Sequence, residues 1–143
     1  MKSADIYWLA GLLEGEGSFY LGSHSQPNIA IAMTDIDVIQ RAHALLGTKS
    51  RIYTNSPRNG GRLKIHVARS IGTRAAGWMM TLYPLMGLRR QGAIRRVLDA
   101  WRAIGIACAE RRVCKRGHPL AAARISTRGS RVCRTCELGR THA

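Results

Sequence analysis

The feature that most constrains this chain is the nonapeptide Leu-Ala-Gly-Leu-Leu-Glu-Gly-Glu-Gly at residues 9–17. Apolar residues at helical spacing precede it, so a helix should begin with Ser3 as its N-cap and stop at Gly15 and Gly17. Glu14 and Glu16 then place two carboxylates at the negative end of that helix, and each internal glycine forfeits roughly 1 kcal/mol of helix stability. Such departures from local preference are typical of functional sites, although a solvated helix end with incidental acids gives the same pattern.

A strip of small residues on the same helix suggests how two copies of the chain could meet. Gly11 and Gly15, with Ala10, would let two helix backbones approach closely. Such a pairing would bring the terminal carboxylates together, ready to share hard cations such as Mg²⁺. In a basic chain, acids and metal placed against phosphate suggest phosphodiester hydrolysis. We therefore expect a dimer interface that includes Tyr7, Ala10, Gly11 and Glu14.

The pattern of the following residues predicts an α+β domain with four antiparallel strands. Turn residues separate the strands, and Gly47 and Pro84 interrupt the helical patterns. After the first helix we expect strands at 18–23 and 28–33, a helix capped by Thr34 or Asp35, strands at 51–54 and 62–67, and helices at 73–83 and 91–104.

The last predicted strand has an alternating pattern. Apolar residues at positions 63, 65 and 67 alternate with Arg62, Lys64 and His66. Because successive side chains of a strand point to opposite faces, this pattern predicts one apolar face and one basic face.

The charge of the chain points to its partner. Lys and Arg number 23 against 8 Asp and Glu, which gives a net charge of +15. Most of these cations are arginines, whose planar fork suits phosphates and guanine edges, so nucleic acid is the expected partner rather than an acidic membrane surface or protein. No apolar run is long enough to span a membrane and no signal peptide is recognisable, so we expect a cytoplasmic protein without membrane association.

The nonapeptide resembles the signature of the LAGLIDADG homing endonucleases, with glutamate in place of aspartate at both acidic positions. The element order predicted for residues 4–104 is similar to the αββαββα fold of that family. One copy of the motif implies a homodimer. The resemblance also implies that the Glu16 carboxylate and the Gly15 carbonyl bind Mg²⁺ or Mn²⁺, with Glu14 in a supporting role.

The resemblance also implies which residues meet DNA. The family's sheet lies in the major groove with its polar face down. Contacts to double-stranded DNA are accordingly expected from Tyr20, His24, Arg51, Tyr53, Arg58, Arg62, Lys64, His66 and Arg90.

Two further positions bear on catalysis in this family. Relatives carry a basic residue after the third helix, which maps to Arg89, with Arg90 next best, and which could stabilise charge on the scissile phosphate. Many relatives also carry a water-ordering Gln after the second strand. Met33 takes that place here, so Thr34 or Asp35 would have to substitute.

Composition divides the chain into an endonuclease domain at residues 1–110 and a basic tail at 111–143. The tail has no aromatic residue and few large aliphatic ones, so it cannot form a core of its own. Cys114, His118, Cys133 and Cys136 form two ligand pairs, the pattern of a structural Zn²⁺ site that could supply the missing folding energy. Reduced cysteines beside a surface histidine are the alternative.

The cysteine pairs of the tail resemble the zinc knuckle of HNH nucleases and treble-clef modules. The chain stops before the helix that an HNH active site would need, so we expect a DNA clamp instead of a second nuclease. Arg116, Arg128 and Arg131 should contact phosphates. Cys108 is left over as a small apolar residue of the last helix.

Together these features predict a site-specific, divalent-metal-dependent double-strand DNA endonuclease. The resemblance implies a homing endonuclease of phage or intron origin, part of a mobile element. It would act on a long pseudo-palindromic site and cut across the minor groove to leave short 3′ overhangs. The alternatives are a non-catalytic DNA-binding regulator on the same fold and an RNA-splicing maturase.

Overall fold

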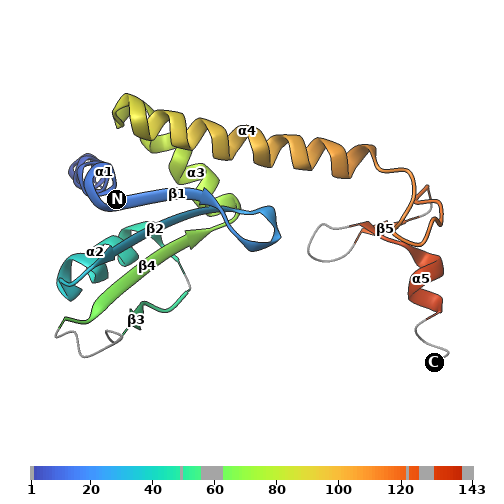
Figure 1. Cartoon of the computed structure of the whole chain (residues 1–143), viewed down its shortest axis with the longest axis horizontal. Coiled ribbons are helices and arrows are strands. Elements are labelled where there is room, and N and C mark those ends of the chain that lie inside the picture. The colour runs from blue at the N-terminus through green and yellow to red at the C-terminus, as the bar shows by residue number, and fades with distance from the viewer. Residues whose placement is uncertain (1, 49, 56–62, 122, 126–130, 140–143) are drawn as a thin grey trace. The chain divides into compact units, whose positions relative to one another are not determined.

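Figure 1 shows the computed structural model of the chain, which describes all residues except 1, 49, 56–62, 122, 126–130 and 140–143. Contacts within the chain divide it into two compact units, Met1–Arg102 and Ala103–Ala143. Their boundary falls inside a long helix, whereas the sequence predicted a boundary at residue 110. Each unit is described by itself below.

The first unit has the predicted element order. A four-stranded antiparallel sheet with strand order β1-β2-β4-β3 is combined with helices from both halves of the unit. Its elements are α1 (Ser3–Glu16), β1 (Gly17–Leu21), η1 (Ser23–Ser25), β2 (Pro27–Met33), α2 (Ile36–Leu46), β3 (Tyr53–Asn55), β4 (Ile65–Ile71), α3 (Thr73–Leu82), η3 (Tyr83–Leu85) and the start of α4 (Leu88–Glu110). The predicted αββαββα order with an additional helix is therefore confirmed.

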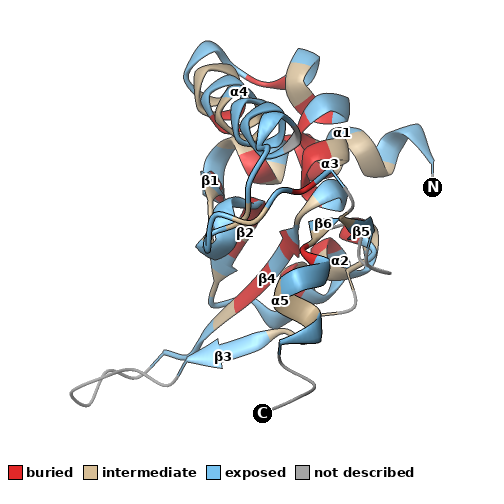
Figure 2. Ribbon diagram, turned by 90° about the vertical axis from the view of Figure 1, so that its right-hand side faces the viewer, coloured by how far each residue is buried: buried red, intermediate tan, exposed pale blue. Residues whose placement is uncertain are grey.

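The core lies between one face of the sheet and the helices. Ile29 and Ile31 of β2 are fully buried, and their antiparallel partners on β1 include Phe19. They form one cluster with Leu9 and Leu13 of α1, with Met79 and Leu82 of α3 and with Ile94 of α4. Figure 2 colours the buried residues of these elements red and the exposed residues pale blue. Helices of the first unit thus cover one face of the sheet, and the other face, called the open face below, is covered by no described helix of that unit.

The sidedness of β4 is the reverse of the prediction. Ile31 pairs with Ala68 and Ile29 pairs with Ser70, so the even-numbered residues of β4 face the helices. His66 lies on this inner side, opposite Met33, while Ile65, Val67, Arg69 and Ile71 lie on the open face. The pattern misled because the strand continues to Ile71, and its fully buried inner positions beyond the predicted end are the small residues Ala68 and Ser70.

The ends of the helices differ in detail from the prediction. The N-cap of α1 is Lys2 and not Ser3, and the Lys2 backbone N–H donates to the Asp5 carboxylate at 3.1 Å. Asp35 precedes α2 as predicted, and Gly47 ends it in the left-handed conformation at φ 59°. The fourth helix is longer at both ends than predicted. The turn predicted between β3 and β4 lies mostly outside the described residues.

The second unit is small and has almost no apolar interior. It contains the end of α4, a two-stranded ribbon of β5 (Arg124–Ile125) and β6 (Arg131–Val132), and the short helix α5 (Arg134–Leu138). Leu120 and Cys133 are the buried residues of its described part. This agrees with the prediction that the tail lacks a core. In the part of the chain that the structure describes, no helix is long and apolar enough to cross a membrane.

Candidate active site and metal-binding cluster

The C-terminal end of α1 carries the two acids of the motif. Glu16 is the last residue of the helix and is exposed, and its carboxylate has no hydrogen bond or ion pair to any described residue. Gly17 begins β1 and is buried, and its N–H donates to the Leu13 carbonyl. A Cβ atom on Gly17 would lie only 2.5 Å from that carbonyl oxygen, so a larger residue cannot make the same exit from the helix. Glu16 is therefore held at the junction of α1 and β1.

Glu14 and Arg90 connect this helix end to the start of α4. Arg90 donates from Nε to the Glu14 carbonyl and from Nη2 to the Gly15 carbonyl, both at 3.0 Å. The Glu14 carboxylate accepts the Gly87 N–H at 3.0 Å, just before α4 begins. A cation thus lies at the negative end of α1 and a carboxylate at the positive end of α4. An acid at the C-terminal end of a helix is normally unfavourable, but here the Glu14 carboxylate is stabilised by the backbone N–H of Gly87, far along the chain.

The two arginines predicted near the active site have different surroundings. Arg89 lies in the first turn of α4 and is exposed, without a hydrogen bond to the described residues. Arg90 was predicted to contact DNA, but its guanidinium is already committed to two backbone carbonyls. Of the two, Arg89 is the cation whose side chain is available to a ligand.

The outer face of α1 differs in one residue from the predicted dimer strip. Tyr7 is 64% exposed, and Gly11 and Gly15 follow it at helical spacing with open space around them. Ala10 is only 5% exposed and packs in the core of its own unit, so it offers little surface to a partner. The helix α1 is apolar on both sides, and the sequence does not distinguish the inner side from the outer one.

The open face of the sheet carries a cation that the sequence analysis missed. Arg69 lies on the interior strand β4, opposite Ala30, with its guanidinium 5.6 Å from the ring centre of Tyr53. Tyr20 of β1 lies on the same face and is 37% exposed. Extending the predicted alternation would have placed Arg69 on the buried face, so only the strand pairing identifies it as a residue of the open face.

The remaining residues predicted to contact DNA from the first unit are scattered. His24 lies in η1 with a positive φ of 62°, and Arg51 and Lys64 are exposed just before β3 and β4. His66 is on the helix-facing side of the sheet, with its Nδ1 2.9 Å from the Thr54 hydroxyl. Arg58 and Arg62 lie outside the described residues.

In the second unit, the four predicted zinc ligands converge. The Cys114 and Cys136 sulfurs are 3.7 Å apart, and the His118 Nδ1 lies 3.3 Å from Cys136 Sγ and 3.8 Å from Cys133 Sγ. All four ligand atoms lie within 4.8 Å of one another. Zinc–sulfur bonds of about 2.3 Å at tetrahedral angles separate two sulfurs by about 3.8 Å. The arrangement therefore fits a tetrahedral zinc ion.

The loop that follows Cys114 is shaped as a metal-binding knuckle. The Arg116 N–H donates to the Cys114 sulfur at 3.3 Å, and Gly117 adopts a positive φ of 80° that lets the chain turn back to His118. Desolvation raises the pKa of Cys114, but backbone hydrogen bonds from Arg116 and His118 outweigh it and bring the pKa to about 6. Desolvation and the neighbouring thiols raise the pKa of Cys136 to about 11. Without a cation the crowding thus opposes a second thiolate beside Cys114, and a bound metal ion would relieve that repulsion.

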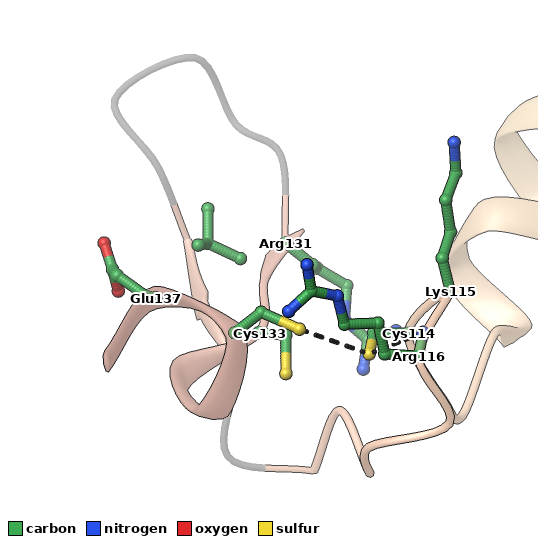
Figure 3. A pocket seen from close by; sticks show the side chains of 8 residues that line it. Cys114, Lys115, Arg116, Arg131, Cys133 and Glu137 are labelled. Carbon is green, nitrogen blue, oxygen red and sulfur yellow. Dashed lines mark hydrogen bonds between the residues drawn. The ribbon is translucent and has the colours of Figure 1, made fainter. Parts of the chain in front are cut away.

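Basic residues surround this cluster, and they differ in their hydrogen bonds and in their exposure. Lys115, Arg116 and Arg131 line a pocket beside the cysteines (Figure 3). Arg131 donates to the carbonyls of Arg111 and Leu120, both at 3.1 Å, so it organises the fold of the tail. Arg116 is exposed and is available to a phosphate, while Arg128 lies outside the described residues. Cys108 is exposed and is not buried as predicted.

Comparisons with known proteins give the following matches. Residues 3–76, from the beginning of α1 into α3, match the family described as the LAGLIDADG-like domain. One solved structure with a similar fold is an archaeal intron-encoded homing endonuclease complexed with DNA. It is 16% identical in sequence with a TM-score of 0.51, and the match covers 75% of this chain and 71% of that one. No curated protein matches the sequence.

Proposed function

The chain belongs to the LAGLIDADG-like domain family, and on this premise we propose that it is a site-specific, metal-dependent endonuclease of double-stranded DNA. The observation that carries the proposal is the exposed, unpaired Glu16 carboxylate beside the exposed Gly15 carbonyl. Acids in such a position are a liability in a chain of net charge +15 that binds a polyanion, unless they bind a metal.

The donors at the end of α1 suit a hard divalent cation. A carboxylate from Glu16 and a carbonyl from Gly15 are oxygen ligands, the type that Mg²⁺ and Mn²⁺ prefer. Bound there, the ion would polarise the scissile phosphodiester and activate water for its hydrolysis. Arg89, exposed at the start of α4, would stabilise the charge that develops on the phosphate. Met33 cannot orient water, so that task falls to Thr34 or Asp35 in this proposal.

The active unit would be a homodimer. One motif supplies one set of ligands, and cutting both strands requires two. The exposed stripe of Tyr7, Gly11 and Gly15 would let the α1 helices of two copies approach closely. By resemblance to the family, the dimer would recognise a pseudo-palindromic site and cut across the minor groove, leaving short 3′ overhangs.

DNA would lie against the open face of the sheet. The similar structure was solved in complex with DNA, and the open face of this sheet carries Tyr20, Tyr53 and Arg69. A planar guanidinium beside an aromatic ring is suited to a bidentate contact with a guanine edge. Exposed Arg51 and Lys64 would contact phosphates near the sheet.

The tail would serve as a zinc-stabilised clamp. Zn²⁺ held by Cys114, His118, Cys133 and Cys136 would supply the folding energy that a unit with almost no apolar core needs. With nine Lys and Arg residues against one acid in residues 111–143, the tail would add affinity for phosphates without sequence preference.

Cleavage of a randomised DNA library in Mg²⁺ or Mn²⁺ tests the proposal. The native protein should cut at a defined site, and Glu16→Gln should abolish cutting while binding persists. Glu110→Gln, the same change at another exposed glutamate, is the matched control and should cut normally. If no variant cuts but all enrich the same DNA, the protein is a regulator. Selective binding of intron RNA over DNA would instead identify a maturase.

A further inference from the structure

Glu16 ends α1 between two glycines. It has Gly15 before it and Gly17 after it, and glycine has more accessible backbone conformations than any other residue. The Gly17 side is fixed, because its N–H is bonded to the Leu13 carbonyl and the residue pairs with Ile31 in the sheet. The Gly15 side is exposed, and nothing lies within 4 Å of its Cβ position. Gly15 lies in the last turn of α1, where its carbonyl has no partner within the helix, so a contact from outside the helix fixes the direction of that carbonyl.

Arg90 supplies that contact. Its Nε and Nη2 donate to two consecutive carbonyls, those of Glu14 and Gly15, at 3.0 Å each. The planar fork of arginine matches two parallel acceptors, whereas a lysine ammonium is a point charge and does not impose their orientation. The bond to the Glu14 carbonyl is part-buried, and the bond to the Gly15 carbonyl is exposed.

The position of Arg90 is in turn fixed by its own segment. The Gly87 N–H donates to the Glu14 carboxylate, and the Gln91 side chain donates to the Met86 carbonyl. The end of α1 and the start of α4 are therefore joined in both directions, by Arg90 reaching one backbone and Glu14 reaching the other. The Gly15 carbonyl still has a second lone pair, so an arginine and a metal can share it.

We propose that Arg90 is a positioning residue for the catalytic cation: by holding the Glu14 and Gly15 carbonyls it orients the Gly15 oxygen and the backbone of Glu16 for metal binding. The inference rests on the proposed function, and it assigns Arg90 a role different from a contact with DNA. Removing a partner that orients a metal ligand typically weakens metal affinity by about 10- to 100-fold.

The test compares Arg90→Lys and Arg90→Met with Arg96→Met, which removes an exposed cation from the same helix. Mn²⁺ binding is measured by electron paramagnetic resonance on the zinc-loaded full chain bound to the DNA it selects, with Glu16→Gln as the reference for a lost ligand. Both Arg90 variants should bind Mn²⁺ about tenfold more weakly or worse, with lower kcat and unchanged DNA affinity. Arg90→Lys keeps the positive charge, so the comparison can still be made if Arg90→Met does not fold.

Several outcomes would overturn the inference. Unchanged Mn²⁺ affinity with weaker DNA binding and a shallower salt dependence would make Arg90 a phosphate contact. Unchanged Mn²⁺ affinity with only a lower Tm would make it a purely structural link. Tighter Mn²⁺ binding would mean that Arg90 obstructs the carbonyl. If Glu16→Gln itself leaves Mn²⁺ binding and cleavage unaltered, the proposed metal site fails, which is distinct from a failure confined to Arg90.

Discussion

Replacing Gly17 by Ala tests the geometry that positions Glu16. The added Cβ would lie 2.5 Å from the Leu13 carbonyl oxygen, 2.6 Å from Leu13 Cδ2 and 2.8 Å from Leu13 Cα. Two of these three atoms belong to the backbone, so the helix end or β1 has to move. Overpacking of this kind costs about 1–3 kcal/mol. The lower entropy of the unfolded alanine chain returns only about 0.4–1 kcal/mol, so the net effect is a loss of stability.

Tryptophan fluorescence during urea unfolding measures this loss in the relevant unit. Trp8, Trp78 and Trp101 all belong to the first unit, so the signal does not report on the tail. Gly77→Ala is the control, because Gly77 lies inside α3 with nothing within 4 Å of its Cβ position. It should stabilise the unit by up to about 1 kcal/mol. If Gly17→Ala is as stable as the native protein, or gains as much as Gly77→Ala, the argument from steric overlap is refuted.

Four further results are expected. Gly11→Ala should not lower the unfolding free energy of the monomer, because the added methyl group meets open space within one copy. In the proposed dimer the same methyl group would hold the two α1 helices apart, so sedimentation should shift toward monomer. An intact dimer would contradict the proposed interface. Ser70→Ala should stabilise the first unit by roughly 1 kcal/mol in urea unfolding, because the buried Ser70 hydroxyl has no hydrogen-bond partner among the described residues; a loss of stability would reveal a partner. Cys136→Ser should abolish zinc binding and make the tail protease-sensitive, and native zinc should be released on acidification because thiols must be deprotonated to bind it; Cys108→Ser, outside the cluster, should change neither. Arg69→Lys keeps the positive charge but loses the planar guanidinium that can make two hydrogen bonds to one guanine. DNA sequences selected by the variant should therefore lose their preference for guanine at one position in each half-site. If the variant binds more weakly but selects the same sequence, Arg69 contacts phosphate instead.

Local features of the sequence were sufficient to predict the element order, the zinc ligands and the position of Glu16. The element order follows from apolar periodicity and from turn residues such as Gly47, which depend only on neighbouring positions. The zinc ligands could be predicted for the same reason. Cys114 and His118 form one close pair and Cys133 and Cys136 another, and the structure brings the two pairs together. The position of Glu16 at the end of its helix could likewise be predicted from the glycines on either side of it.

Tertiary structure alone decided which faces and partners these elements use. A strand alternates with period two, and this pattern is identical for either orientation until a neighbouring strand sets the register. The pairing of Ile31 with Ala68 turned His66 inward and Arg69 outward. The helix α1 is apolar on both sides, so only packing could bury Ala10. Arg90 reaches the Gly15 carbonyl across 75 residues of sequence, a contact that no local pattern encodes because it forms only when α1 and α4 meet.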